Sequence, residues 1–267
     1  MKLRNTLHAI ITESVSSVRL GGNWRSRLRL MTDFLLSHLL FALPPSMAGR
    51  ERKILTRSGH TISYRLNRGD LQGIREVWCN EVYRPSFVIS PGALLDFGAN
   101  IGLTSLWMAT QFHFTRILAV EPNPDNAALT AKNLAQNGIA AQVIEAAIGP
   151  KDGTAHFKTS AWSNLGQLAD EGVPVRMVSA ASLLREHGVD SVGLAKVDIE
   201  GGEQALFLGP SEWLDRVGAL IVEFHPNLVD YPLLTKTVAS HGFDYIPATE
   251  HCMDSFVRSA PAGGAAA

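Results

Sequence analysis

The chain has 267 residues, which is long enough for one large α/β domain with extensions. Its hydrophobic content of 46% suits a well-buried globular core, and its net charge of −1 gives no overall basic character that would favour nucleic acid as a partner. The two cysteines, Cys79 and Cys252, provide neither the spacing of a zinc site nor a disulfide framework, so we expect a reducing compartment and a cytoplasmic location.

Charge is divided unevenly along the chain. Residues 1–75 contain 13 Lys and Arg but 4 Asp and Glu, whereas the remainder contains 11 and 21, so the two parts carry net charges of +9 and −10. The basic segment could face an acidic substrate, a membrane surface or the acidic remainder of the chain. Packing within the chain, with solvated arginines, is the simplest of these interpretations.

Residues 1–45 are predicted to form two helices, separated by Gly21-Gly22-Asn23 and ended by Pro44 and Pro45. The first twenty residues lack the apolar stretch of a signal peptide. The most apolar run, Phe34 to Leu43, is too short to cross a membrane, which needs ~20 residues. We therefore expect a packed or interfacial helix here and no transmembrane segment.

The next segment is predicted to contain a hairpin and a helix. Residues 52–66 alternate apolar and polar side chains around Ser58-Gly59-His60, which indicates two paired strands. Asp70 is expected to cap a helix that runs to about Tyr83 and ends before Pro85. Residues 1–85 are therefore interpreted as an N-terminal helical and hairpin extension.

From residue 93 the pattern alternates between strands and helices. Strands are predicted near 93–97, 116–120, 141–145, 193–198 and 218–224, helices near 102–111, 124–137, 179–187, 202–208 and 229–241, and shorter strands at 156–158 and 175–178. This alternation predicts an α/β domain over residues 86–250, with a doubly wound parallel sheet and helices on both faces. Residues 251–267, which end in a run of Gly and Ala, are predicted to be a disordered tail.

The strand predicted at 93–97 leads into a glycine turn. Asp96 lies near its end, and Gly98 and Gly102 bracket the turn, where they let a ligand approach the main chain. Dinucleotide sites use G-x-G-x-x-G, but Asn100 here occupies the place of the middle glycine. Asp96 suits a cationic ligand, and Glu121 at the end of the next strand suits a ribose diol. These features favour S-adenosylmethionine, which carries a sulfonium and an ammonium group, over NAD or FAD.

Donor contacts are therefore predicted at the ends of three strands. The predicted residues are Asp96, Gly98, Ala99, Asn100, Ile101, Gly102, Glu121, Pro122, Asn123, Glu145 and Ala146. Glu145 would contact adenine or ribose, or else be a solvated strand-end residue, and Ala146 would lie against the adenine face. A plain strand–helix turn would explain the glycines, but not the two carboxylates at strand ends.

Two later strand ends carry further polar side chains. Asp198 and Glu200 alternate along one, and Glu223 and His225 along the other, so each pair shares a face. These strands are expected to be neighbours, and ligands bind beyond their carboxyl ends. An isolated histidine would usually be structural, but burying four such groups without a function is costly. We therefore expect them to converge where a methyl acceptor binds.

Five motifs in this order resemble the FkbM-type methyltransferase family, from about Leu94 to Phe243. They are Asp-Phe-Gly-Ala-Asn-Ile-Gly at 96–102, Glu-Pro-Asn-Pro at 121–124, Ala-Ala-Ile-Gly at 146–149, Lys-Val-Asp-Ile-Glu-Gly-Gly-Glu at 196–203 and Glu-Phe-His at 223–225. The resemblance implies a class I methyltransferase fold, which is Rossmann-like, S-adenosylmethionine as donor, and O-methylation of a small molecule or sugar. Gly202 departs from the family, which more often has Ala or another side chain there.

Methyl transfer to an alcohol needs alignment and a base or a metal. His225 is the first choice for the base, with Glu223 orienting it, while Asp198 is a rival base or a contact for the amino-acid part of the donor. A magnesium or manganese ion held by Asp198, Glu200 and either Glu223 or His225 is an alternative, because these metals prefer oxygen ligands. Without a metal, Glu200 would bind acceptor hydroxyls.

Residues outside the main motifs also have predicted roles. Trp162 and Asn164 are expected in a loop lining the acceptor pocket, with Trp162 stacking on a ring, or else in a surface turn. Tyr83 and Glu81 either reach the donor or pack a helix.

Three classes of function remain open from the sequence. The first is an O-methyltransferase acting on a sugar or natural-product hydroxyl. The second is a nicotinamide-dependent oxidoreductase, against which Asn100 argues, and the third is a noncatalytic S-adenosylmethionine-binding protein. A nucleic-acid methyltransferase is less favoured, since the catalytic part is acidic and carries no Asn/Asp-Pro-Pro-Tyr/Phe signature. A homodimer is possible, and no nucleic-acid partner is expected.

Overall fold

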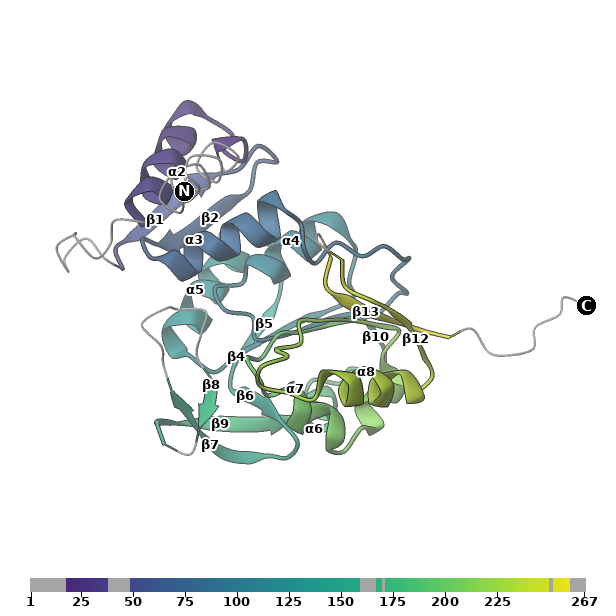
Figure 1. Cartoon of the computed structure of the whole chain (residues 1–267). Helices are drawn as coiled ribbons and strands as arrows, with labels where there is room; N and C mark the ends of the chain where they lie inside the picture. The colour runs from purple at the N-terminus through teal and green to yellow at the C-terminus, as the bar shows by residue number, and fades with distance from the viewer. Residues whose placement is uncertain (1–17, 38–48, 159–166, 170, 250–251, 260–267) are drawn as a thin grey trace, which may run out of the picture.

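The computed structural model describes residues 18–37, 49–158, 167–169, 171–249 and 252–259. A seven-stranded sheet runs through its centre in the order β12-β13-β11-β10-β3-β4-β5 (Figure 1). The strands are β3 (Ala93–Phe97), β4 (Ile117–Glu121), β5 (Gln142–Glu145), β10 (Val192–Val197), β11 (Ala219–Val222), β12 (Phe243–Ile246) and β13 (Asp254–Arg258). β13 is antiparallel to both of its neighbours, and the other pairs are parallel. The predicted doubly wound α/β fold is confirmed.

Helices cover both faces of this sheet, because successive strand residues point to opposite sides. Leu94 packs with the helices of one face, whereas Leu95 and Phe97 pack with those of the other. The first face carries α3 (Arg68–Ile74), α4 (Leu103–Gln111) and α5 (Pro124–Ala135), and the second carries α6 (Ala180–Glu186), α7 (Glu203–Leu208), the 3₁₀ helix η3 (Glu212–Arg216) and α8 (Tyr231–Ser240). The strand order reverses between β3 and β10, which places a binding crevice at their carboxyl ends.

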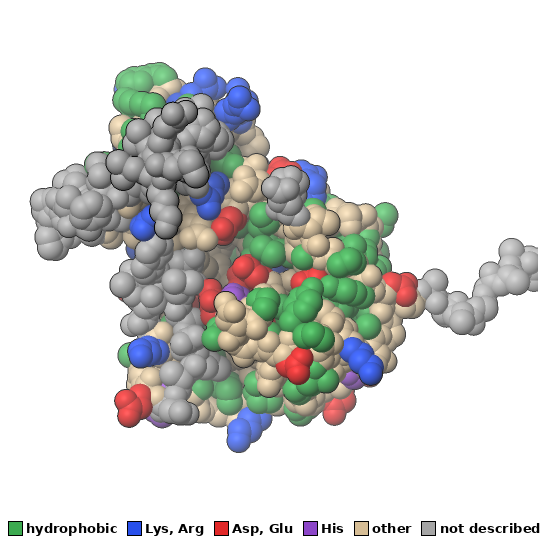
Figure 2. Space-filling view, in the orientation of Figure 1, with side chains coloured by type: hydrophobic (Ala, Val, Ile, Leu, Met, Phe, Trp, Pro, Cys, Tyr) green, Lys and Arg blue, Asp and Glu red, His purple; other side chains and the backbone are tan. Residues whose placement is uncertain are grey.

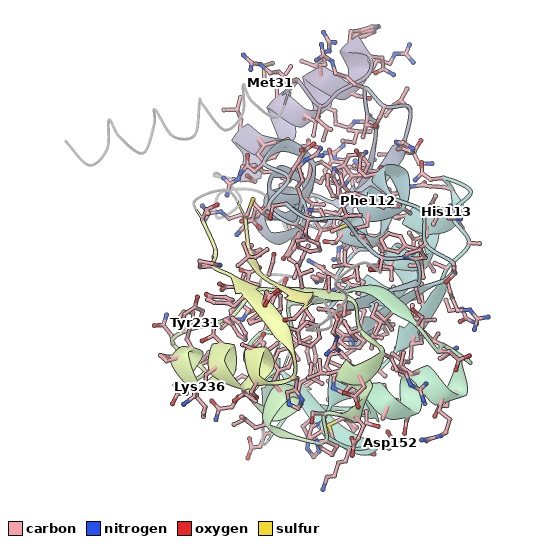
Figure 3. The ribbon with its side chains drawn as sticks, turned by 90° about the vertical axis from the view of Figure 1, so that its right-hand side faces the viewer. Met31, Phe112, His113, Asp152, Tyr231 and Lys236 are labelled. Carbon is pink, nitrogen blue, oxygen red and sulfur yellow. The ribbon has the colours of Figure 1, made fainter. Side chains whose placement is uncertain are left out.

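A second, four-stranded sheet follows the central strands β3 to β5 along the chain. It consists of β6 (Ala147–Gly149), β7 (Gly153–Lys158), β8 (Gln167–Ala169) and β9 (Val173–Ser179) in the order β6-β9-β7-β8. Figure 3 shows Asp152, just before β7, and Met31 of α2 (Trp24–Ser37) at opposite ends of the molecule. The small sheet and the N-terminal elements therefore flank the central sheet from two sides.

The N-terminal hairpin forms as predicted, from β1 (Glu51–Leu55) and β2 (Thr61–Arg65). The free edge of β2 is occupied by side chains of α5 and of the turn after it. Asn133 Oδ1 accepts a 2.8 Å hydrogen bond from the Ser63 amide, and Asn137 Oδ1 accepts one of 2.8 Å from the Thr61 amide. One apolar core includes Ile54 and Ile62 of the hairpin together with Leu94 of β3, so the described part of the extension packs as part of the domain.

The positive charge of the N-terminal part lies on its surface. Figure 2 shows Lys and Arg side chains gathered over the elements around α2. Of the two helices predicted in residues 1–45, α2 begins after Gly21-Gly22-Asn23 as expected, and the first lies largely outside the described residues. Within the described parts of the chain, none of the helices combines the length and apolar character that a membrane span requires.

Asp70 does not cap its helix, so that prediction was wrong. Asn67 is the extended residue before α3, and its side chain accepts a 2.8 Å hydrogen bond from the Asp70 amide. The Asp70 carboxylate instead pairs with the Arg65 guanidinium at 2.9 Å. The helix continues as one π-helical segment, η2 (Arg75–Cys79), and stops before the predicted end at Tyr83.

The prediction of a disordered tail over 251–267 was wrong for its first part. β13 lies inside the sheet between β11 and β12, and Phe256 is fully buried. The strand is short and only its central residue carries a large apolar side chain, so the Gly- and Ala-rich sequence after it dominated the prediction. Residues 260–267 lie outside the described residues.

Candidate active site

A cavity of about 320 Å³ opens at the carboxyl ends of β3, β4, β10 and β11. This is the edge at which the strand order reverses. One wall comes from the N-terminal part of the chain, through residues of α3 and η2 and through Tyr83. The cavity therefore lies where the fold predicts a ligand, but it is completed by a segment outside the central sheet.

The two glycines of the first loop are required by packing within the protein. Gly98 has φ of 75°, and a Cβ atom on it would overlap the carbonyl oxygen of Asp198. Gly102 has φ of 76°, and a Cβ there would lie 2.8 Å from the Thr130 side chain. The sequence interpretation attributed these glycines to the approach of a ligand. In the structure, Asp198 and Thr130 of the chain itself already leave no room for a Cβ atom at these positions.

Glu121 joins the first loop to the second. Its carboxylate accepts hydrogen bonds from the amides of Asn100 at 2.8 Å and Asn123 at 3.0 Å. Burial raises the pKa of Glu121 to about 7, although these hydrogen bonds act in the opposite direction. Asn100 adopts φ of 50°, which asparagine tolerates better than most side chains. Glu121 and Asn100 both line the cavity.

The donor side of the cavity fits a nucleoside. The side-chain oxygen of Asn100 is buried without a hydrogen-bond partner, which leaves an acceptor for a polar ligand group. Ala146, Ile148 and Phe157 provide an apolar wall suited to a flat base. The carboxylate of Glu121 lies in the same cavity and can accept hydrogen bonds from hydroxyl groups. These residues are compatible with S-adenosylmethionine.

Not every predicted donor residue faces this cavity. Gly98, Ala99, Asn100, Ile101, Glu121, Pro122 and Ala146 line it, whereas Asp96, Gly102, Asn123 and Glu145 do not. Asp96 is fully buried, where it accepts a 2.6 Å hydrogen bond from Ser105 and lies 3.2 Å from the Lys196 ammonium. Asn123 caps α5.

Lys196 is a buried cation that links the first loop to the acceptor side. Its ammonium donates hydrogen bonds to the carbonyls of Phe97 at 3.2 Å and Gly98 at 2.6 Å, and lies 3.7 Å from Asp198. Burial lowers its pKa, but the charges of Asp96 and Asp198 outweigh burial and raise it overall. Lys196 therefore stays charged and fixes the turn after β3 against the end of β10.

The structure brings together the four residues predicted on the acceptor side. Asp198, Glu200, Glu223 and His225 all line the cavity. His225 Nε2 lies 3.3 Å from Glu200 and 3.9 Å from Asp198. Acidic side chains are visible along the hollow between the N-terminal part and the rest of the molecule (Figure 2).

His225 is held from behind by Glu203, a residue that the sequence interpretation did not assign. The fully buried Glu203 carboxylate lies 3.1 Å from Nδ1 and also accepts a hydrogen bond from the Ile199 amide. Burial lowers the pKa of His225, but the hydrogen bond and charge of Glu203 outweigh it and raise the pKa to about 9. The imidazole therefore carries two protons at neutral pH.

Tyr83 connects the two acidic strand ends. Its hydroxyl lies 3.0 Å from Asp198 and 2.9 Å from Glu223. A phenol has one proton to donate, so it cannot satisfy both carboxylates at once. Burial and, after it, the charge of Asp198 raise the pKa of Glu223 to about 7. Glu223 is therefore partly protonated at neutral pH.

Several residues of the site were not predicted from the sequence. Glu76 and Gln72 line the cavity from the N-terminal part, and the Gln72 amide donates a 2.8 Å hydrogen bond to Glu76. Lys196 and Glu203 belong to the same motif as Asp198. Because side chains alternate along a strand, the spacing of two residues could have placed Lys196 on the same side of the strand as Asp198. Nothing local in the sequence marks Glu76. Trp162 and Asn164 lie outside the described residues.

The strand order of the central sheet, its antiparallel strand β13 and this cavity are those of a class I methyltransferase. Residues 96–245 match the sequence model of the methyltransferase FkbM domain, and the chain belongs to this family of methyltransferases. Membership implies S-adenosylmethionine as the methyl donor.

Individual relatives and a solved structure share low sequence identity with this chain. The chain is 24% identical over 231 residues to 31-O-demethyl-FK506 methyltransferase FkbM of Streptomyces tacrolimicus, covering 71% of this chain and 87% of that protein. It is 27% identical over 149 residues to hexuronic acid methyltransferase AglP of Haloferax volcanii, covering 55% and 61%. A crystal structure of methyltransferase FkbM from Methylobacillus flagellatus aligns at a TM-score of 0.43 and 13% identity, covering 92% of this chain and 58% of that one.

Proposed function

We propose that this protein transfers the methyl group of S-adenosylmethionine to a hydroxyl of a sugar or a small natural product. The observation that carries the proposal is the cluster of Asp198, Glu200, Glu223 and His225, which shares one cavity with Asn100 and Glu121. The names of two relatives, which describe a demethyl-FK506 and a hexuronic acid as their acceptors, support this class of substrate.

The donor side of the cavity binds S-adenosylmethionine and orients it. Glu121 would accept hydrogen bonds from the ribose hydroxyls of the donor, and the unpartnered side-chain oxygen of Asn100 would accept a further one. The apolar wall formed by Ala146 and Phe157 excludes water from the base. The bound donor supplies an electrophilic methyl group on a sulfonium.

The acceptor side must remove a proton from the hydroxyl group. His225 was the first choice for this base, but a pKa raised to about 9 leaves the imidazole already protonated at neutral pH. Burial and the charge of Asp198 raise the pKa of Glu200 to about 7, which suits a general base at neutral pH. We therefore assign proton acceptance to Glu200, and donation of a hydrogen bond to the acceptor oxygen to His225.

The pH dependence of the reaction distinguishes these two assignments. With Glu200 as base, kcat/KM rises as pH increases through about 7, because Glu200 loses its proton, and falls above about 9, because His225 loses its own. With His225 as base, the rate would continue to rise up to about 9. The profile is measured on the acceptor identified by a screen for S-adenosylhomocysteine release.

A divalent cation is a second candidate for assisting the same step. Asp198, Glu200 and His225 each offer a ligand atom, and these atoms lie within 4.8 Å of one another. Of the two residues predicted as alternatives for the third ligand, His225 lies in this group, whereas Glu223 contacts the Tyr83 hydroxyl. Activity that is lost in EDTA and restored by magnesium would favour this mechanism, whereas full activity in EDTA would remove it.

Calorimetric titration with S-adenosylhomocysteine, with NAD as the control ligand, tests the donor assignment. We expect micromolar binding of S-adenosylhomocysteine and none of NAD. Glu121→Gln should weaken binding at least about tenfold, which corresponds to ~1.4 kcal/mol. Glu145→Gln is the matched control, because Glu145 is an exposed strand-end carboxylate outside the cavity. Binding of NAD, or of neither ligand, would contradict the proposal.

A further inference from the structure

The helix α2 turns its more apolar side away from the protein. Its buried side chains are Ser26, Leu30, Asp33, Phe34 and Ser37. Its exposed large apolar side chains are Trp24, Leu28, Met31 and Leu35, with exposed fractions of 69%, 48%, 38% and 40%. Their spacing places these four on one side of the helix, over a length of about 16 Å. They form the outer face of α2, and Figure 3 shows Met31 at the outer end of the molecule.

The inward side of α2 is fixed by polar contacts, so the helix cannot turn its outer face toward the core. Ser26 Oγ accepts a 3.0 Å hydrogen bond from the Leu55 amide of β1, and Asp33 accepts one of 2.7 Å from the Tyr64 hydroxyl. Rotation of the helix would leave these buried polar groups without partners. The exposure of the outer face is therefore imposed by the fold, and apolar side chains gathered at a surface mark an interaction site.

Exposed arginines border the outer face on both sides. With about 100° of turn between successive residues, Arg25 and Arg29 lie on one side of it and Arg27 lies on the other. Asp33 is the acidic residue of α2, and it is buried on the opposite side of the helix. Figure 2 shows hydrophobic side chains next to Lys and Arg side chains at the end of the molecule that carries α2. The border of the outer face is therefore positively charged.

The neighbouring hairpin adds to this positive charge. Arg29 donates a 2.7 Å hydrogen bond to the carbonyl of Lys53 in β1, and the side chains of Lys53 and Arg57 are exposed. The exposed carboxylate of Glu51 in the same strand is paired with Lys132. The hairpin beside α2 therefore presents unpaired positive charge on the side of Arg29.

The combination of an apolar stripe and a basic border favours an anionic lipid surface over a second copy of the chain. Two copies packed through this face would bring their arginines together, and none of the residues of α2, all of which the structure describes, exposes a carboxylate to pair with them. A helix that lies in a membrane surface combines an apolar face with basic side chains that meet anionic headgroups. Tryptophan is enriched at the same boundary.

We propose that α2 binds the surface of a membrane rich in anionic lipid, with its outer face between the headgroups and the acyl chains and its arginines against the phosphates. The helix lies parallel to the membrane plane and does not cross it. This surface is outside the cavity, so the proposal and the proposed function are tested independently of each other.

Co-sedimentation of the full chain with lipid vesicles tests the proposal. Vesicles with about one-third phosphatidylglycerol should bind the protein at least about tenfold more tightly than vesicles of phosphatidylcholine alone. Raising the salt from about 0.1 M to about 1 M, which shortens the Debye length from about 10 Å to about 3 Å, should weaken this binding. Absence of binding to the anionic vesicles, or equal binding to both kinds, would overturn the proposal.

Two pairs of leucines with matched exposure distinguish docking through α2 from nonspecific adsorption. Leu28→Ser/Leu35→Ser should weaken binding to the anionic vesicles at least about tenfold, because both side chains lose their burial in the bilayer. Leu208→Ser/Leu233→Ser changes leucines of α7 and α8 that are 47% and 43% exposed, and it should leave binding unchanged. Equal losses in the two double variants would contradict docking through α2.

Arg25→Gln tests the contribution of charge. We expect it to weaken binding to the anionic vesicles about threefold or more, with no effect on phosphatidylcholine vesicles. Lys236→Gln is the matched control, because Lys236 is an exposed cation of α8 (Figure 3). A dimer that forms without lipid in sedimentation velocity, and that Leu28→Ser/Leu35→Ser dissociates, would assign the outer face to a second copy and overturn the proposal.

Discussion

The two sides of the cavity are built in different ways. On the donor side, one carboxylate, Glu121, is satisfied largely by backbone amides of adjacent loops. On the acceptor side, the charged side chains that follow β10 and β11 contact one another, Glu203 at the start of α7, and the hydroxyl of Tyr83 from the N-terminal part. The donor side therefore depends on one carboxylate that backbone amides hold in place, whereas the acceptor side depends on the balance of several coupled charges.

The largest expected effect comes from the point where the two sides touch. Gly98→Ala places a methyl group against the Asp198 carbonyl, at a φ of 75° that already disfavours alanine. We expect the free energy of unfolding to fall by about 3 kcal/mol or more, with loss of S-adenosylhomocysteine binding. Denaturant unfolding and calorimetry measure the two effects.

Gly138→Ala is the matched control for this substitution. Gly138 has φ of 71°, but a Cβ atom there meets nothing within 4 Å. Its cost should be about 1 kcal/mol, since only the backbone conformation opposes it. Equal costs at the two positions would show that the contact between loops is unimportant.

Tyr83→Phe should separate the acceptor side from the donor side. The change removes the hydroxyl that contacts Asp198 and Glu223, and hydrogen bonds to charged groups contribute about 1.5–3 kcal/mol. We expect kcat/KM for the acceptor to fall about 10- to 100-fold, with the Kd of S-adenosylhomocysteine unchanged. Steady-state kinetics and calorimetry provide the two readouts.

Tyr64→Phe controls for the loss of a buried phenol–carboxylate contact elsewhere. Tyr64 donates a 2.7 Å hydrogen bond to Asp33 in the N-terminal part. This variant should lose stability but keep its catalytic parameters. If it lost activity as severely as Tyr83→Phe, the effect of Tyr83 would be attributable to general destabilisation.

The smallest expected effect concerns the pH dependence of stability on the donor side. Burial raises the pKa of Glu121 to about 7, so between its unfolded value of 4.5 and that pH the folded protein binds more protons than the unfolded chain. Stability from this group is therefore lost as pH rises through that interval. Glu121→Gln should remove about 1–2 kcal/mol of the difference in unfolding free energy between pH 5 and pH 8. An unchanged slope would contradict the assigned pKa.

The donor side could be predicted from the sequence because its residues lie in short contiguous motifs. The turn from Asp96 to Gly102 and the strand end at Glu121 lie in short motifs with fixed chemistry. Asp96 was misinterpreted because a carboxylate next to a glycine turn does not reveal which cation it faces, and that cation, Lys196, comes from another strand. The sheet over residues 93–222 was predicted almost residue by residue, since buried parallel strands leave strong apolar runs.

On the acceptor side, the sequence predicted the charged residues but not their contacts. Alternation placed Asp198 with Glu200, and Glu223 with His225, but the partners that set their protonation states were not visible. Tyr83 lies 115 residues before Asp198, and no periodicity links the two. β13 was missed for a related reason, since its place in the sheet depends on pairing with β11 rather than on its own composition.

The contacts of Tyr83 define how much of the chain a working enzyme needs. The region that matches the family, residues 96–245, begins after Tyr83 and ends before β13. A recombinant fragment with those boundaries would retain the turn after β3 and the carboxylates, but lose the hydroxyl between Asp198 and Glu223 and the edge of the sheet beside β11. The family domain is thus smaller than the part of the chain that builds this cavity, and transplanting the activity into another scaffold would require the preceding helix and Tyr83 as well.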